Sequence, residues 1–370
     1  MDRQTAIGTV SIGRMHQEGG FVFDRDYYFD PEHRWRQDLE IARWCEETYA
    51  PYPIYNAEAH LINLDDQPNP FRQIGGLQPN LILAAALGAE LVFYGHQDPD
   101  VSGQPLKGID SLVALRSFEG LDWATLEPIA TFLRQMDAFK EEYAGTGIDI
   151  FPPFFWDRSG RATIHGLLTT AHKLMGEEFF LLPLTDPELA RAVLDWIADA
   201  YLDLIRLFAD RAGHSITSLH VGECSGCMFS SEQWDLAIPA TNRIVDACGT
   251  CRIHSCGKSD HLLEQMAKVH NLSNFNIGSG TSVARSRKIV GTGRQLDVIP
   301  DPAMLHGGTT SDVRAFMKQV LAENEEGPLE IQFHMEPGMP WENALAIFET
   351  MRAHGVVPEY TSLVERWGHA

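Results

Sequence analysis

Short apolar segments alternate with longer segments of helical periodicity along most of the chain. The short segments end in Gly, His, Asp or Pro, which is typical of strands that run into loops. They cover residues 89–98, 215–223, 251–257, 273–280, 294–302 and 329–338. The longer segments repeat apolar residues every three or four positions, as amphipathic helices do. They cover residues 34–49, 186–213, 259–269, 310–324 and 340–355.

The helix expected in the 186–213 segment has clear ends. It begins at an Asp-Pro pair and ends in Gly213, so we expect it to run from about Pro187 to Ala212. Strands that alternate with helices indicate parallel βα units. At least five such units follow one another in the second half of the chain. No G-x-G-x-x-G follows an early strand, which counts against a dinucleotide-binding fold.

We therefore predict an α/β protein with a single (β/α)₈ barrel of the TIM type. The barrel would cover residues 51–370, and residues 1–50 would form an irregular N-terminal extension packed on it. In such barrels the chemistry lies at the carboxyl ends of the strands. Polar residues with suitable chemistry lie at or just beyond the predicted ends, namely His220, Glu223, His254, Cys256, Asp301, His334 and Glu336.

Composition and charge limit the classes of partner that we expect for this protein. The chain has 29 Lys and Arg against 51 Asp and Glu, and no basic run, so we expect no nucleic-acid partner. The first residues lack a basic segment followed by an apolar block, and no apolar run is long enough to cross a bilayer. We expect a cytoplasmic protein that acts on a small molecule and has reduced cysteines.

The sequence Arg252-Ile-His-Ser-Cys-Gly257 carries the most informative pair of side chains. Residues i and i+2 of a strand point to the same side, so His254 and Cys256 would reach into one space. Imidazole and thiolate are ligands that Zn²⁺ prefers, and a third ligand would leave one position open for chemistry.

A different zinc site is suggested by Cys224-x-x-Cys227 and Cys248-x-x-Cys251, whose spacing is close to that of a four-cysteine structural site. However, the intervening segment 229–247 is itself predicted to be a helix, which begins at Ser230 or Ser231. About fifteen helical residues span roughly 22 Å, so the two pairs would lie at opposite ends of the barrel. We expect Cys248 and Cys251 to be buried as small apolar residues.

The second half of the chain resembles the uroporphyrinogen decarboxylase superfamily, in particular its zinc-dependent, corrinoid-linked branch, which includes the methylcobamide:coenzyme M methyltransferases. The resemblance covers roughly residues 150–360. Four motifs carry it: the segment from RATIHG to DLI at 161–205, FSSEQWDLAIPATNRI at 229–244, the IHSCG turn at 253–257 and PWENALAIF at 340–348. The family fold is a (β/α)₈ barrel, in agreement with the pattern above.

The resemblance implies that His254 and Cys256 bind zinc. The family's third ligand is normally a cysteine at the end of the last strand. Here the corresponding segment reads IQFHMEPGMPWEN, without cysteine, and His334 is the nearest candidate. Imidazole is a competent zinc donor. Glu336 and Cys224 are the alternatives for this position.

The resemblance further implies methyl transfer between a corrinoid and a thiol that zinc activates. The chain has no Asp-x-His-x-x-Gly cobalamin motif, so a corrinoid would arrive on a separate protein. Glu223 is a candidate general base or temporary metal ligand, or else a carboxylate held by loop amides. Asp301 either contacts the substrate or caps the helix that begins near Pro302.

Other functions are consistent with the same barrel. The superfamily's decarboxylases are metal-free and use an arginine-bearing motif near the N-terminus, of which Phe71-Arg72-Gln73 is a partial match. A metal-dependent lyase or hydrolase would activate water instead of a thiol. A non-enzymatic carrier or sensor would lack the metal altogether.

Overall fold

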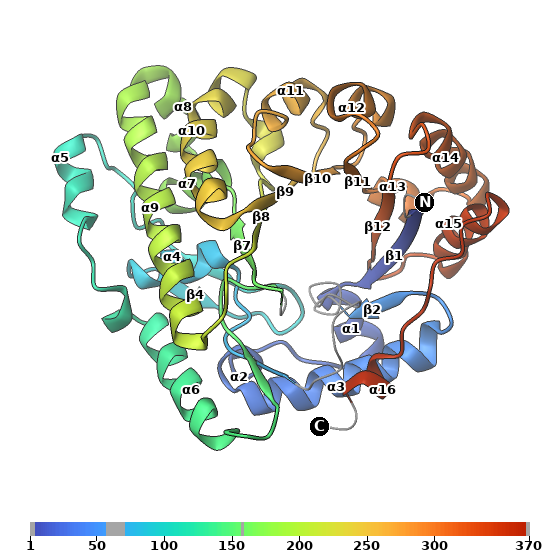
Figure 1. Cartoon of the computed structure of the whole chain (residues 1–370), viewed down its shortest axis with the longest axis horizontal. Coiled ribbons are helices and arrows are strands. Elements are labelled where there is room, and N and C mark those ends of the chain that lie inside the picture. The colour runs from blue at the N-terminus through green and yellow to red at the C-terminus, as the bar shows by residue number, and fades with distance from the viewer. Residues whose placement is uncertain (1–3, 57–70, 157–158, 368–370) are drawn as a thin grey trace.

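The computed structural model describes residues 4–56, 71–156 and 159–367. Its main element is a curled sheet of eight parallel strands in the order β2-β1-β12-β11-β10-β9-β8-β7 (Figure 1). These strands are β1 (Gln4–Val10), β2 (Ile54–Asn56), β7 (Arg161–His165), β8 (Ser218–Gly222), β9 (Thr250–His254), β10 (Leu272–Ile277), β11 (Gln295–Val298) and β12 (Leu329–Met335). Short pairs of strands lie apart from it: β3 (Phe71–Gln73) with β6 (Asp149–Phe151), and β4 (Glu90–Val92) with β5 (Asp100–Ser102).

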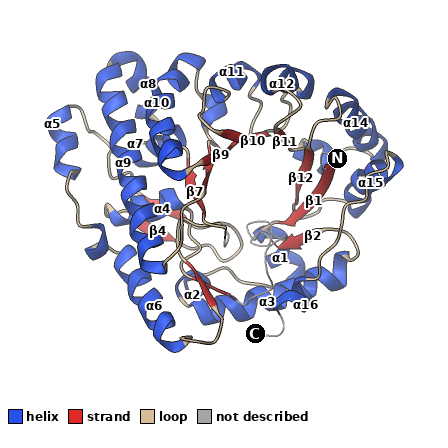
Figure 2. Ribbon diagram, in the orientation of Figure 1, coloured by secondary structure: helices blue, strands red, loops and turns tan. Residues whose placement is uncertain are grey.

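Helices cover the outer face of the curled sheet (Figure 2). The α-helices in the first half are α1 (Ile12–Gly19), α2 (Arg25–Phe29), α3 (Pro31–Tyr49), α4 (Pro79–Ala86), α5 (Leu112–Leu115), α6 (Ile129–Glu142), α7 (Leu167–Met175) and α8 (Glu178–Thr185). Those in the second half are α9 (Pro187–Ala212), α10 (Ser231–Cys248), α11 (Leu263–Met266), α12 (Val283–Val290), α13 (Pro302–Gly307), α14 (Thr310–Glu323), α15 (Trp341–Ala353) and α16 (Leu363–Trp367). Within the described residues, no helix has both the length and the apolar character needed to span a membrane.

The predicted (β/α)₈ architecture is confirmed in part. All eight strands of the main sheet are parallel, and helices follow the strands on the outside. Among the described residues no strand pairing joins the edge strands β2 and β7, so the hydrogen-bonded sheet is an arc with one open side. The predicted segment at 89–98 forms β4, which pairs antiparallel with β5 outside the main sheet.

The prediction that residues 1–50 form an irregular extension is wrong. Residues Gln4–Val10 form β1, which lies inside the main sheet and pairs with β12 on one side and β2 on the other. The sequence QTAIGTV conceals this strand, because Thr and Gly interrupt its apolar residues. Gly8 has a packing reason to be there, since a Cβ at this position would lie 2.8 Å from both Ile54 and Phe333.

The helices have the ends that the sequence predicts. Helix α9 runs over Pro187–Ala212, with the Asp186 side chain accepting a hydrogen bond from the Leu189 amide and Gly213 in the left-handed conformation. Helix α10 begins with a capping box in which Ser230 and Gln233 bond reciprocally. These caps satisfy backbone groups at the ends of both helices.

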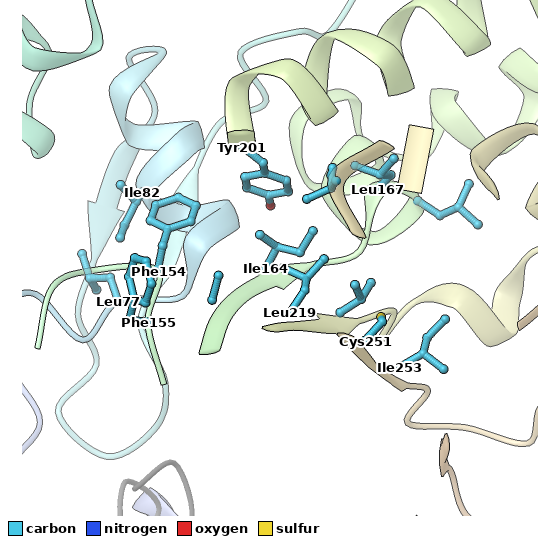
Figure 3. Packing of buried hydrophobic residues seen from close by; sticks show 14 of the residues in the cluster. Leu77, Ile82, Phe154, Phe155, Ile164, Leu167, Tyr201, Leu219, Cys251 and Ile253 are labelled. Carbon is cyan, nitrogen blue, oxygen red and sulfur yellow. The ribbon is translucent and has the colours of Figure 1, made fainter. Parts of the chain in front are cut away.

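Two faces of the strands β7 to β9 differ in chemistry. Outward residues such as Ile164, Leu219 and Ile253 are fully buried against Leu167 and other apolar side chains of the helices (Figure 3). The alternate residues are polar and point to the inside of the arc. This arrangement leaves the apolar core between sheet and helices, and a polar lining on the concave side.

Candidate metal centre and cavity

A cavity of about 540 Å³ lies on the concave side of the sheet, near the carboxyl ends of the strands. Its size is within the range of small-molecule sites. Residues of β7, β8, β9, β10 and β12 line it, together with Tyr28 of α2 and the loop residues Asp98 and Trp156. The position at the strand ends agrees with the prediction for barrel enzymes.

The ends of three adjacent strands are in register at the cavity. His165 of β7 pairs with Gly222 of β8, and Gly222 pairs with His254 of β9. Residues that are opposite each other in neighbouring parallel strands project to the same face. The two imidazoles therefore border the cavity on either side of a glycine.

Three soft donors lie together beside this row. The Cys224 Sγ, the Cys256 Sγ and a ring nitrogen of His254 all lie within 4.8 Å of one another. The His254 Nε2 is 2.8 Å from the Cys256 Sγ, and its Nδ1 is hydrogen-bonded to the Asn276 side-chain oxygen. That bond makes Nδ1 the donor nitrogen and directs Nε2 to the Cys256 sulfur, the orientation that zinc-binding histidines use.

The thiols of Cys224 and Cys256 have pKa values that are shifted in opposite directions. A hydrogen bond from Cys224, together with contributions from His254 and His334, lowers the pKa of Cys256 below that of an ordinary thiol. The same hydrogen bond and burial raise the pKa of Cys224. The pair therefore holds a single negative charge readily, on Cys256. A cation at this point would favour ionisation of both sulfurs.

The structure brings together two of the three predicted metal ligands, His254 and Cys256. Cys224, one of the alternatives for the third position, completes the group of mutually close donors. His334 lies near the end of β12 and lines the same cavity, as does Glu336, but neither belongs to that group. Loss of hydration inside the cavity lowers the pKa of His334 from its usual value.

Glu223, a predicted catalytic residue, is 2% exposed and does not line the cavity. Its carboxylate accepts hydrogen bonds from the amides of Leu168 and Thr169, both at 3.0 Å, and from the Thr169 hydroxyl at 2.9 Å. These groups belong to the first turn of α7, where the amides and the helix dipole favour a negative charge. These contacts agree with the alternative of a carboxylate held by amides, and they attach the loop after β8 to α7.

Asp301, the other predicted catalytic residue, is exposed and accepts a hydrogen bond from the Ala303 amide at 2.9 Å. It is thus the N-cap of α13. Since it does not line the cavity, the capping alternative describes its position.

A buried polar network forms the wall below the donors, and the sequence did not predict it. Arg252 donates to Asp297 at 2.8 Å and to Gln332 at 2.8 Å, and it lies 2.9 Å from the His220 Nδ1. The Trp156 ring stacks on His220 at a centroid distance of 4.0 Å. These residues are far apart in the sequence, so only their alternation on separate strands gave a signal.

The cysteine pairs are separated as expected. Cys248 and Cys251 are 3% and 0% exposed, at the opposite end of the strands from Cys224. Burial raises the pKa of Cys248 to about 11, although the nearby Arg206 acts in the opposite direction. A four-cysteine site is therefore absent from the described residues, and these two thiols belong to the core.

Comparisons with known proteins identify the family of the chain. The family model for uroporphyrinogen decarboxylase (URO-D) matches residues 162–354, slightly more than half of the chain. The chain belongs to the uroporphyrinogen decarboxylase family. No curated protein matches the sequence.

Solved structures show the fold at low sequence identity. A methyltransferase from Methanosarcina mazei aligns with a TM-score of 0.61 and 15% identity, over 96% of this chain and 94% of that chain. Another structure, "Crystal Structure of SacUVDE", aligns over 96% of this chain and 100% of that chain, at 11% identity. Its TM-score of 0.35 is too low to support an argument.

Arg72, the arginine of the Phe71-Arg72-Gln73 segment, is not among the residues that line the cavity. Arg72 is 6% exposed, and its Nε donates to Glu32 at 2.7 Å. The guanidinium also lies over the rings of Trp35 and Tyr143, at 4.7 and 5.2 Å from their centroids. This arginine is used in packing, so it offers no grip on the carboxylates of a tetrapyrrole.

Proposed function

We propose that this family member is a zinc-dependent methyltransferase that moves a methyl group between a protein-bound corrinoid and a small thiol. The observation that carries the proposal is the close group of Cys224, His254 and Cys256, of which Cys224 and His254 line the cavity. Two sulfurs and one imidazole with a fixed tautomer are the donors that zinc prefers. Three protein ligands leave a fourth position for substrate, as in catalytic zinc sites.

The residues present fit the metal. Cys224, His254 and Cys256 would hold it, and Asn276 would keep the imidazole oriented through its bond to Nδ1. His334 of β12 lines the same cavity and also lowers the pKa of the Cys256 thiol. When bound, zinc would lower the pKa of a substrate thiol and hold the thiol as its thiolate. Two protein thiolates make that sulfur more nucleophilic than a site with two imidazoles would.

The chain's own residues prepare the site. Glu223 holds the loop of Cys224 through its bonds to α7, and the buried network around Arg252 fixes the ends of β8 and β9. A corrinoid would come from a separate protein that docks over the mouth of the cavity, since no cobalamin motif is found in the sequence.

Free methylcobalamin and 2-mercaptoethanol test this function without the partner protein. We expect the zinc-loaded chain to demethylate methylcobalamin only when the thiol is present, as followed by the change in corrin absorbance. Chelator treatment and His254→Ala should abolish the reaction, whereas His270→Ala should not, because His270 lies outside the cavity and pairs with Asp246. A zinc-dependent reaction with water and no use of the thiol would instead favour a lyase or hydrolase.

A further inference from the structure

The register of three strand ends leaves a defined space beside the donor group. His165 and His254 flank Gly222 across neighbouring strands and face the same side. All three residues line the cavity. The space above Gly222 is therefore bounded by an imidazole that binds metal in our proposal and by another that has no role in it.

Gly222 keeps this space open. A Cβ at this position would lie 3.7 Å from the His220 Nε2, 3.7 Å from the Ile164 oxygen and 3.9 Å from the Cys224 Sγ. These are ordinary van der Waals distances, and the φ angle of Gly222 is not in the left-handed region. An alanine thus fits the protein, but its methyl group would occupy the space beside the sulfur of Cys224.

His165 has hydrogen-bonding capacity that the protein does not use. Its Nδ1 is buried and has no hydrogen-bond partner, although buried polar atoms in proteins are normally paired. Burial, with the nearby charges of His254 and Lys173, lowers the pKa of His165 to about 4. The ring is therefore neutral at pH 7 and offers one donor and one acceptor.

The described wall of the cavity has little positive charge to offer. Among the described residues that line the cavity, Arg252 is the only lysine or arginine. Its three guanidinium nitrogens already contact Asp297, His220 and Gln332. Asp98 and Glu336 add carboxylates to the lining. A sulfonate or phosphate would lose its hydration here and gain no countercharge from this wall.

We propose that the space above Gly222 is the substrate subsite and that it takes a small uncharged thiol. The thiol sulfur would sit at the metal position, and a hydroxyl or amide two or three atoms away would hydrogen-bond to His165. This inference rests on the proposed function, because it needs the sulfur of the substrate at the metal. His165 is then a binding residue that selects the polar end of the substrate.

Thiol binding to the cobalt-substituted chain tests the subsite directly. Titration with 2-mercaptoethanol should add sulfur-to-cobalt charge-transfer absorption, and its change gives the dissociation constant. We expect His165→Leu to weaken binding roughly tenfold, in line with loss of one buried hydrogen bond. His165→Asn keeps a polar group near Nδ1 and should lose less. Gly222→Ala should weaken binding of the thiol while cobalt content stays unchanged.

Matched controls are His270→Leu and Gly293→Ala, since His270 is exposed and a Cβ at Gly293 meets nothing within 4 Å. Both should bind 2-mercaptoethanol as the wild type does. We expect 2-mercaptoethanesulfonate to bind more weakly than 2-mercaptoethanol. Far-UV circular dichroism and cobalt content check that each variant is folded.

The outcomes separate the two proposals. If no thiol changes the cobalt spectrum of the wild type, both the proposed function and the subsite are overturned. If thiols bind equally well to wild type, His165→Leu and Gly222→Ala, the subsite is overturned and the function stands. Tighter binding of the sulfonate than of the hydroxyl compound would overturn the assigned substrate class.

Discussion

Glu223 and Thr169 are joined by two hydrogen bonds, because the carboxylate accepts from both the amide and the hydroxyl of Thr169. The loop after β8 is thereby attached to the start of α7. Gly166 makes room for this contact, since a Cβ there would lie 2.0 Å from the Glu223 carboxyl carbon. The next residue after Glu223 is Cys224, so the same contact positions a proposed zinc ligand.

Substitution Glu223→Gln should therefore act on stability and on metal binding. The amide keeps only one acceptor oxygen and places an NH₂ group near the backbone amides of α7. We expect a loss of about 1–3 kcal/mol in the free energy of unfolding, from urea denaturation. Zinc affinity, measured by competition with a chelator, should fall as well. Unchanged stability and zinc affinity with a lost catalytic rate would restore Glu223 as a general base.

A substitution at Gly278 should also disturb the proposed metal centre. A Cβ at Gly278 would lie 2.2 Å from the backbone carbon and oxygen of Cys256, which side-chain movement cannot relieve. Gly278→Ala should displace the Cys256 turn and weaken zinc binding, measured with the same chelator competition. Gly293→Ala is the matched control, because its Cβ meets nothing within 4 Å. Equal zinc affinity in the two variants would contradict the prediction that zinc binding depends on the position of the Cys256 turn.

The ion pair of Arg252 and Asp297 is nearly inaccessible to solvent, and its atoms are 2.8 Å apart. Arg252→Met leaves the Asp297 carboxylate buried without its partner. We expect a loss of about 3–5 kcal/mol in the free energy of unfolding. The double variant Arg252→Met with Asp297→Leu removes both charges and should recover part of that loss. A double variant whose destabilisation equals the sum of the two single losses would contradict this coupling.

The pKa of His165 gives a pH prediction. In the folded chain it is lowered to about 4 from 6.5, so the unfolded chain binds more protons between these values. Stability should therefore fall as the pH drops from about 6.5 towards 4, by up to about 3 kcal/mol from this residue. His165→Leu should remove that part of the pH dependence. Urea unfolding of both proteins with a chelator present measures it, and parallel pH curves would contradict the assignment.

The sequence predicted the parts of the fold that local patterns determine. The helix at Pro187–Ala212 and the strands in the second half follow from periodicity and caps, and their order gives parallel pairing. Strand β1 was missed, because its identity depends on pairing with β12, more than 300 residues away in the sequence. Such long-range pairing leaves little trace in a single strand's composition.

The sequence likewise predicted only some of the contacts in the candidate site. His254 and Cys256 lie two residues apart on one strand end, so their proximity follows from strand geometry. His165 ends β7 and Cys224 lies in the loop after β8, so their place beside His254 depends on the register of β7, β8 and β9. Glu223 lies next to Cys224 in the sequence, yet its carboxylate faces α7, which only the packed structure reveals.

The zinc content of the purified chain and of four variants tests the central claim most directly. Elemental analysis should find about one zinc per chain in the wild type and in His334→Ala. It should find zinc lost or strongly reduced in His254→Ala, Cys256→Ser and Cys224→Ser, since these three residues form the donor group. Zinc retained in Cys224→Ser and lost in His334→Ala would contradict this ligand set, and a wild type without bound metal would contradict the zinc-dependent function.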